Sequence, residues 1–353
     1  MKKLLGLLAI VIAGAAGFLA LTPSPIDPLA WQAPPAPLLT GVLEPNDTLM
    51  KAELLGQGQI HGPEDSAVDA QGNVYAGLHD GRIVRIGVDG KIDTLAATGG
   101  RPLGMDFDAQ GNLIVADAYK GLLRINPQGQ IEVLATEADG VPFAFTDDVD
   151  IASDGRIYFS DASSKFNQPD YLLDLLEGRP YGRLLRYDPA TGKTETLLKD
   201  LYFANGVALS QHEDFVLVNE TYRYRITRYW LKGDKAGSHD IFIDNLPGMP
   251  DNIQGDRAGT FWVALPTPRK ADADFLQNQP WLKAQMAKLP RSMWPKPKDY
   301  GFAIALNEQG QIVQSLHDAS GTHLRMVTSA KPVGDFLYFG SLDNDRIGKL
   351  KIR

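Results

Sequence analysis

The chain contains no cysteine. Disulfides and thiolate metal sites are therefore excluded, and any metal ion must be held by oxygen or imidazole ligands. Clusters of Lys and Arg are also missing, and the formal net charge is -8. Because a phosphate backbone is bound by clustered cations, this charge balance argues against nucleic acid as a partner.

The N-terminus carries a hydrophobic run. Lys2 and Lys3 precede the uncharged, mostly apolar stretch Leu4 to Leu21, about 18 residues or roughly 27 Å of helix. No clean A-x-A cleavage site follows. We therefore expect residues 1–21 to be a transmembrane signal-anchor, with the rest of the chain on the periplasmic or extracytoplasmic side. A cleaved signal, which would give a secreted or periplasmic protein, is the alternative. A Pro-rich linker is expected over residues 22–50, ahead of one folded domain at 51–353.

Glycine and proline are abundant, with 35 and 23 copies spread along the chain, which indicates many turns between short strands. One pattern recurs, a turn residue followed by a short apolar strand. Its copies begin at Gly72, Gly111, Gly155, Glu213, Gly259 and Asp335. Most are followed by a second strand pair with its own D-G, P-x-G or T-G turn, which is a hairpin signal. Six units of four strands predict an all-β fold, a six-bladed β-propeller.

Two features complete the predicted ring. Residues 346–353 should pair with residues 51–56 and close it. Two insertions interrupt the repeat, at 162–182 and 266–300. In the second, Trp281, Leu282, Met286 and Leu289 fall roughly on one side of a short helix. This helix is open to three interpretations: a lid over a site, a patch resting on a bilayer, or packing on the rim.

The residues eight positions before each turn residue carry the functional signal. They are Glu64, Leu103, Asp147, Asn205 and Asp251, and Asn252 adjoins the last. This position begins the innermost strand of every blade, so these side chains should face the axis at one level. Three carboxylates and two amides on one axis suit a hard cation such as Ca²⁺. Glu64, Asp147, Asn205, Asp251 and Asn252 are therefore the predicted ligands of one axial Ca²⁺. Capping of turns by single Asp or Asn side chains is the alternative for each one alone.

The sequence resembles the strictosidine synthase-like family, within a wider group of calcium-dependent propellers that includes paraoxonases, gluconolactonases and adipocyte plasma membrane-associated protein. The resemblance rests on GPEDSAVD, TDDVDIASDGRIYFSDASSKF, YGRLLRYDPATGKTETLLKDLYFANGVALS and LPGMPDNIQGD. It implies metal-ligand roles for Glu64 of GPED, Asn205 of FANGV, and Asp251 and Asn252 of MPDNI. The blade-three ligand is usually the Asn of an N-D pair, and this chain has Asp147 followed by Asp148.

Two departures limit what the resemblance implies. The P-H-G motif that carries a catalytic histidine in paraoxonases reads Pro102-Leu103-Gly104 here. The last blade's inner strand is expected to begin at His323 and contains no glutamate, which argues against strictosidine synthesis itself.

The predicted function is metal-dependent hydrolysis of a small lactone or ester, of the lactonase or arylesterase type. The axial cation would polarise the substrate carbonyl. A general base is also needed, and the candidates are Asp148, Asp147, His323 and His61. The alternative is a non-catalytic propeller in which calcium is structural and the face binds a ligand or a protein.

Overall fold

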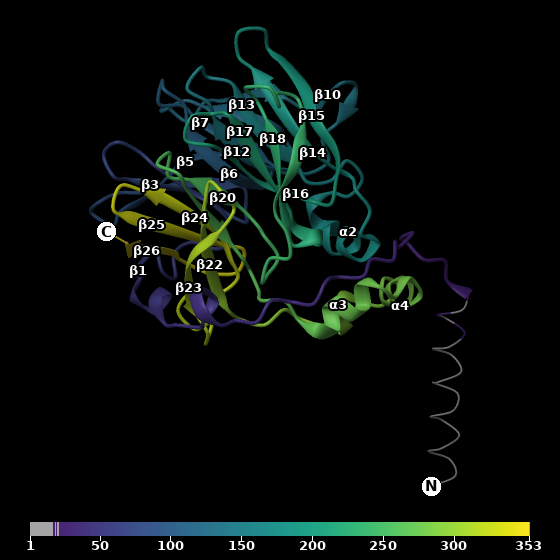
Figure 1. Cartoon of the computed structure of the whole chain (residues 1–353). Coiled ribbons are helices and arrows are strands. Elements are labelled where there is room, and N and C mark those ends of the chain that lie inside the picture. Colours follow the sequence, from purple (N-terminus) through teal and green to yellow (C-terminus); the bar gives the residue numbers. More distant parts are fainter. Residues whose placement is uncertain (1–16, 18, 20, 353) are drawn as a thin grey trace.

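The computed structural model describes residues 17, 19 and 21–352 (Figure 1). Six four-stranded antiparallel sheets form a six-bladed β-propeller, as predicted. Blade one consists of β2 (Ser66–Val68), β3 (Val74–Gly77), β4 (Arg82–Ile86) and β5 (Ile92–Ala97). Blade two consists of β6 (Pro102–Phe107), β7 (Leu113–Asp117), β8 (Gly121–Ile125) and β9 (Ile131–Ala135). Blade three consists of β12 (Thr146–Ile151), β13 (Ile157–Asp161), β14 (Gly182–Asp188) and β15 (Lys193–Leu201).

The second half of the ring repeats this order. Blade four consists of β16 (Ala204–Leu209), β17 (Phe215–Glu220), β18 (Arg225–Trp230) and β19 (His239–Ile243). Blade five consists of β20 (Ile253–Gly255), β21 (Thr260–Ala264), β22 (Gly301–Asn307) and β23 (Ile312–Asp318). Blade six consists of β24 (Val327–Val333), β25 (Phe336–Ser341), β26 (Ile347–Lys351) and the N-terminal β1 (Glu53–Leu55). A short hairpin, β10 (Glu137–Ala138) with β11 (Val141–Pro142), lies between blades two and three.

The ring closes as the sequence predicts. β1 pairs with β26 in antiparallel register, with Glu53 opposite Lys349 and Leu55 opposite Ile347. The outermost strand of blade six therefore comes from the opposite end of the domain from its other three strands. This pairing ties the first blade to the last and leaves no gap in the ring.

Successive residues of a strand pack against different neighbouring blades, because strand side chains alternate between the two faces of the sheet. In β21, Phe261 and Val263 belong to the apolar cluster shared with blade four, whereas Trp262 and Ala264 belong to the cluster shared with blade six. Similar clusters fill the other interblade spaces. Burial on both faces explains why strands such as FVLVNE read as nearly continuous apolar runs.

The insertions and the N-terminal segment lie on one side of the ring (Figure 1). The first insertion contains η3 (Gln168–Asp170) and α2 (Tyr171–Glu177), and the second contains α3 (Ala271–Gln277), α4 (Pro280–Met286) and η5 (Arg291–Met293). Both connect the second strand of a blade to its third. Such connections leave the ring at the end where the inner strands begin, so all three helices share a face with the predicted axial site.

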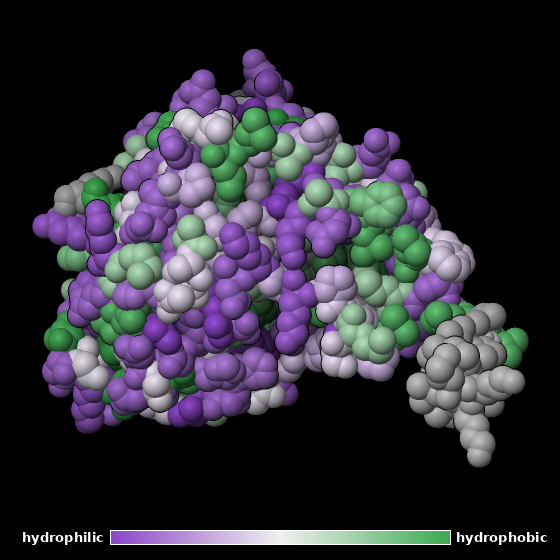
Figure 2. Space-filling model, turned by 90° about the horizontal axis from the view of Figure 1, so that it is seen from below, coloured by the Kyte–Doolittle hydropathy of each residue, from purple (hydrophilic) through white to green (hydrophobic). Residues whose placement is uncertain are grey.

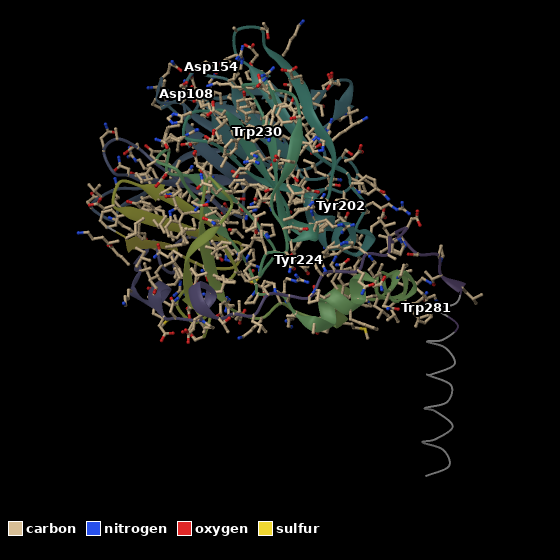
Figure 3. All side chains as sticks on the ribbon, viewed as in Figure 1. Asp108, Asp154, Tyr202, Tyr224, Trp230 and Trp281 are labelled. Atoms are coloured by element: carbon tan, nitrogen blue, oxygen red, sulfur yellow. The ribbon has the colours of Figure 1, made fainter. Side chains whose placement is uncertain are left out.

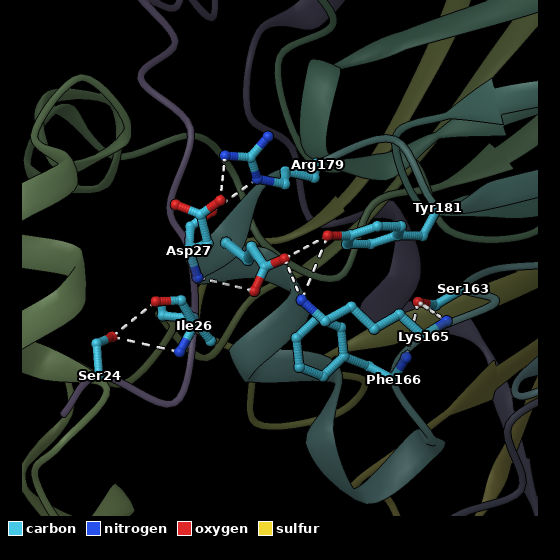
Figure 4. A network of polar contacts seen from close by, with 9 residues as sticks. Ser24, Ile26, Asp27, Ser163, Lys165, Phe166, Arg179 and Tyr181 are labelled. Carbon is cyan, nitrogen blue, oxygen red and sulfur yellow. Dashed lines mark hydrogen bonds and ion pairs between the residues drawn. The ribbon is translucent and has the colours of Figure 1, made fainter.

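Residues 22–50, expected to form a linker, pack against the propeller. They include η1 (Gly41–Leu43), while η2 (Thr48–Lys51) leads into β1, and Leu43 and Leu49 are buried. Figure 4 shows how the segment is tied to the first insertion: the Asp27 amide donates to Glu177 Oε2 at 3.1 Å, and Arg179 Nη2 donates to Asp27 Oδ2 at 2.6 Å. The segment is thus a structural part of the propeller face.

The predicted anchor, Leu4 to Leu21, lies almost entirely outside the described residues. Within the described part of the chain, no helix has the length and apolarity that crossing a membrane requires.

Candidate functional site

The predicted ligands lie where the inner strands begin. Asp147 and Asn205 are the second residues of β12 and β16, and Glu64 and Asp251–Asn252 directly precede β2 and β20. Their exposed fractions are 2% for Glu64, 3% for Asp147, 5% for Asn205, 9% for Asp251 and 0% for Asn252. Five polar side chains from four blades are therefore withdrawn from solvent around one end of the axis.

Two hydrogen bonds connect these side chains across the ring. Asn205 Nδ2 of blade four donates to Asp251 Oδ1 of blade five at 2.7 Å. Asn252 Nδ2 of blade five donates to Glu64 Oε2 of blade one at 3.4 Å, although blade six lies between these two blades. Contacts between blades that are not neighbours require convergence on the axis, so the structure brings four of the five predicted residues together through hydrogen bonds. Asp147 is related to them through its charge, which acts on Glu64.

The acidic members carry more negative charge than the site can hold alone. Burial raises the pKa of Glu64 and of Asp147 well above their ordinary values, and the charge of Asp251 is the next cause in both cases. Burial also raises the pKa of Asp251 itself, to about 7. Carboxylates that repel one another in a dry environment are stabilised by a nearby cation.

The donor atoms fit a hard divalent cation. Oδ1 of Asn205 and Oδ1 of Asn252 are buried and have no hydrogen-bond partner, which is costly unless an ion or water completes them. Carboxylate and amide oxygens are the ligands that Ca²⁺ prefers. No group of three or more His, Cys, Asp or Glu side chains among the described residues is arranged to hold a metal, so ligation depends on the two amides and stays a prediction.

Asp148, a predicted general base, forms hydrogen bonds with the backbone of the inner strands. Its Oδ2 accepts from the Val207 amide of blade four at 2.9 Å, and its Oδ1 accepts from the Val149 amide at 2.8 Å. Asp65, the residue after Glu64, bonds the Met105 amide of blade two in the same way at 3.1 Å. Each of these carboxylates joins its blade to the next one, and both oxygens of Asp148 already accept from backbone amides.

Glycines at the same position of blades two and four allow this close approach. A Cβ at Gly104 would lie 2.3 Å from Asp148 Oδ1 and 2.9 Å from the Asp147 carbonyl. Gly206 is confined in the same way by Ile253 and by the backbone of Asp251 and Asn252. In blades two and four the inner strands can approach their neighbours this closely because no side chain is present at this position.

A buried lysine lies among a further set of acids. Lys331 of β24 donates from Nζ to the Met105 carbonyl at 2.6 Å and lies 3.9 Å from Asp65 and 3.7 Å from Asp106. Its pKa is raised because the charges of Asp106, Asp65 and Asp148 outweigh the opposing effect of burial, which is the largest single contribution. The chain thus supplies its own cation to these acids, in contrast to the cluster around Asp251.

The expected position of His323 is wrong. β24 begins at Val327, so His323 lies in the preceding loop, and Thr328 is the second residue of the inner strand. The His323 ring bonds the Ala52 carbonyl through Nε2 at 2.8 Å, next to the outermost strand of the blade. Counting back eight positions from Asp335, as for the other blades, gives Val327, the first residue of β24, so the repeat offset holds in blade six and the placement at His323 did not follow it.

His61 lies at the edge of the site beside a second histidine. The ring centroids of His61 and His79 are 5.7 Å apart, and both residues are exposed. Partial burial lowers the pKa of His79, and the charges of Arg101 and His61 lower it further. A histidine kept neutral in this way can accept a proton near neutral pH. His79 lies in the connection between β3 and β4. The offset of eight positions from each turn residue therefore could not identify it.

Arg101 is the most informative residue that sequence reasoning missed. It is 2% exposed, and its Nη2 donates to the Gly62 carbonyl at 3.1 Å. Its Nε and Nη1 have no partner. Burial lowers the pKa of Arg101, and the charge of Glu64 is the largest opposing influence, followed by Tyr119, Asp117 and Asp147. Buried donors without a partner among the described residues are costly, so this guanidinium is a candidate binding group.

Two tyrosines complete the surroundings. The Tyr222 hydroxyl donates to the Tyr171 carbonyl at 2.8 Å. Burial raises the pKa of both phenols, and the charge of Asp251 contributes to each shift. Tyr222 packs with Leu103, Phe145 and other apolar side chains in one cluster. This cluster forms an apolar wall beside the carboxylates, with α2 packed against it.

Comparisons with known proteins agree with this architecture. The profile of the strictosidine synthase family matches residues 147–234, and that of the strictosidine synthase-like N-terminal region matches residues 41–86. Adipocyte plasma membrane-associated protein of Rattus norvegicus is 38% identical over 98% of this chain and 97% of its own length. Strictosidine synthase-like protein 6 of Arabidopsis thaliana is 38% identical over 86% of this chain and 82% of its own.

Solved structures share the fold at low sequence identity. A gluconolactonase from Xanthomonas campestris superposes with a TM-score of 0.63 and 18% identity, covering 94% of this chain and 99% of its own. Regucalcin, a calcium-binding protein from Agrobacterium tumefaciens, superposes with a TM-score of 0.58 and 15% identity, covering 86% and 91%. With relatives 38% identical along nearly their whole length, the chain belongs to the strictosidine synthase-like family.

Proposed function

We propose that this protein is a calcium-dependent hydrolase of small lactones or esters. The observation that carries the proposal is the buried pair of unpartnered amide oxygens, on Asn205 and Asn252, among three carboxylates with raised pKa values. Glu64, Asp147, Asn205, Asp251 and Asn252 would hold the ion. When bound, the cation would polarise the substrate carbonyl and stabilise the developing oxyanion.

The chain's own groups supply the other requirements of hydrolysis. Arg101 offers two nitrogens without a recorded partner, Nε and Nη1, as donors to an oxygen of the substrate. Such a donor stabilises negative charge that develops during attack, and burial strengthens its effect. The apolar wall that includes Tyr222 and Leu103 would exclude water from the non-reacting part of the substrate.

The proton acceptor that we propose is the His61–His79 pair. The two rings lie 5.7 Å apart, and His79 is kept neutral by partial burial and by the charges of Arg101 and His61. Asp147 remains an alternative base. We do not assign this role to Asp148, whose two oxygens accept from backbone amides, or to His323, whose ring contacts the Ala52 carbonyl.

The activity is tested on the chelator-stripped full chain with phenyl acetate and a panel of γ- and δ-lactones, with calcium or with EGTA. Turnover that depends on calcium and disappears in Asn205→Ala supports the enzyme. A matched control is Asn126→Ala, which removes a turn-capping amide far from the site, where Oδ1 accepts from the Gln128 and Gln130 amides. This control should keep its turnover.

The second candidate is a non-catalytic propeller with structural calcium. Leu103 favours it, because this axial position of blade two is filled by an apolar side chain packed with Ala118, Phe145 and Tyr222. Calcium binding without turnover on the whole panel would support this candidate and contradict the hydrolase.

We also propose that the chain is membrane-anchored through Leu4 to Leu21, with the propeller on the periplasmic or extracytoplasmic side. The name of its adipocyte plasma membrane-associated relatives supports membrane association. Protease accessibility of the propeller in intact cells and in spheroplasts tests the side. Resistance in both preparations would contradict it.

A further inference from the structure

The second insertion carries an unusual combination of exposed apolar side chains. Phe275 in α3 is 62% exposed, Trp281 in α4 70%, Leu282 38%, and Met293 in η5 65%. Figure 3 shows Trp281 at the outer end of the insertion, away from the strands, and Figure 2 shows apolar side chains gathered over this part of the face. Exposed apolar groups concentrated on one short segment mark an interaction surface.

The insertion is folded, so this exposure is not a sign of a loose segment. Met286, Leu289 and Trp294 pack into a cluster with Ile26 and Leu176. The expectation that Trp281 and Leu282 share one side with Met286 and Leu289 is wrong, because the first pair faces solvent and the second pair faces the cluster. The insertion therefore has an inner side that packs on the rim and an outer side that no other described part of the chain covers.

The same segment is basic, although the protein is acidic overall. Between Asp274 and Asp299 the sequence contains no acidic residue, and the cations are Lys283, Lys288, Arg291, Lys296 and Lys298. Lys296 and Lys298 are exposed, on either side of Pro297. Apolar and aromatic side chains next to lysines match a bilayer surface, where rings enter the headgroup region and cations attract anionic lipids.

The insertion is also tied to the chain that follows the N-terminal apolar run. Lys288 Nζ donates to the Leu19 carbonyl at 2.6 Å, and Lys283 Nζ donates to the Leu29 carbonyl at 2.7 Å. Leu21 is 87% exposed at this place. The N-terminal apolar run, Leu4 to Leu21, therefore ends next to the insertion that carries the exposed apolar side chains.

We infer that the outer side of the insertion, formed by Phe275, Trp281, Leu282 and Met293 with Lys296 and Lys298, rests on the surface of a bilayer that contains anionic lipids. This face is the one on which the inner strands begin. The candidate site therefore faces the bilayer, whether or not it is catalytic.

The absence of cysteine makes a direct test possible. The exposed Ser292, next to Met293, is replaced by Cys in the full chain and labelled with an environment-sensitive fluorophore. The control is Val88→Cys, in the turn between β4 and β5 at the opposite end of the ring, where Val88 is 77% exposed. Both proteins are reconstituted in vesicles of phosphatidylcholine, with or without phosphatidylglycerol, that contain lipids with a bromine quencher in the acyl chain.

The inference predicts quenching at position 292 about fivefold stronger than at position 88, and stronger with phosphatidylglycerol. Trp281→Ser with Phe275→Ser should reduce quenching in both kinds of vesicle. Lys296→Ser with Lys298→Ser should remove only the effect of phosphatidylglycerol. Equal quenching at the two positions overturns the inference. A shift in the fluorophore's emission at position 292 that depends on protein concentration instead of lipid also overturns it, because such a shift would indicate contact between copies of the chain.

Discussion

Asn205 Nδ2 donates to Asp251 Oδ1 at 2.7 Å and thereby joins blade four to blade five at the propeller axis. The other side-chain atom of this amide, Oδ1, is buried without a partner. The amide group of Asn205 thus holds a neighbouring predicted ligand, Asp251, in place and keeps its own oxygen available. This double role makes Asn205 the most informative position to change.

Replacement of Asn205 by Ala should reduce calcium affinity at least tenfold, since it removes one ligand and the contact that orients another. The stabilisation that calcium provides, measured as the rise in melting temperature at fixed calcium concentration, should fall accordingly. Asn126→Ala should melt at a lower temperature but show the wild-type calcium response. Equal calcium responses of wild type and Asn205→Ala would contradict a ligand role.

For Arg101 we predict that calcium affinity and turnover change in opposite directions. Arg101→Gln removes a positive charge next to Glu64 and Asp147, and this charge repels a bound calcium ion. The variant should therefore bind calcium several-fold more tightly. If Arg101 donates to the substrate, turnover should fall about 100-fold in the same variant. Calorimetry and kinetics measure the two effects separately. The exposed Arg124, paired with Glu132, provides the control Arg124→Gln, which should change neither. A parallel loss of affinity and turnover would indicate a merely structural guanidinium.

Lys331 should contribute to stability through the buried acids that face it. Lys331→Met leaves Asp65 and Asp106 without their cation and should lower the free energy of unfolding by about 3 kcal/mol. Asp65→Asn in the same chain should restore part of the loss, because the uncompensated charge is then gone. Denaturant titration of the single and double variants measures this coupling. Additive losses would show that the ammonium and Asp65 do not interact.

Asp174 of α2 predicts a pH dependence of stability. Burial raises its pKa from 3.8 to about 7, and its Oδ2 has no partner. Because the folded state prefers the protonated acid, its stabilising contribution is complete below about pH 4 and is lost as pH rises through about 7. Asp174→Asn should therefore stabilise the protein by about 2 kcal/mol at pH 8 and leave it unchanged at pH 4. Asp272→Asn, an exposed acid in α3, should have no such effect. Melting curves of the wild type and of both variants at the two pH values measure this difference.

The sequence predicted the fold, and it predicted a set of polar residues at the start of the inner strands, because both follow from repetition. Gly72, Gly111, Gly155 and Gly259 mark the same turn in four blades, so one offset from them locates the start of each inner strand. Blades four and six have Glu213 and Asp335 in place of the turn glycine, and the same offset from Asp335 gives Val327, where β24 begins, so the placement of this strand at His323 departed from the repeat.

Arg101 and Lys331 could not be found in this way. Their roles depend on contacts between blades that lie far apart in sequence: Arg101 reaches the Gly62 carbonyl, and Lys331 of blade six reaches the Met105 carbonyl of blade two. Such pairings exist only after the ring has closed. The folded path of residues 22–50 was missed for a similar reason, since its partners, such as Glu177 and Arg179, belong to the first insertion.

The central claim is that oxygens from four blades hold one divalent cation. Isothermal titration of the chelator-stripped full chain with calcium tests it most directly, with Asn205→Ala titrated in parallel. We expect one binding event per chain in the wild type, and weak or no binding in the variant. No binding heat in the wild type, together with a melting temperature that calcium leaves unchanged, would contradict the claim.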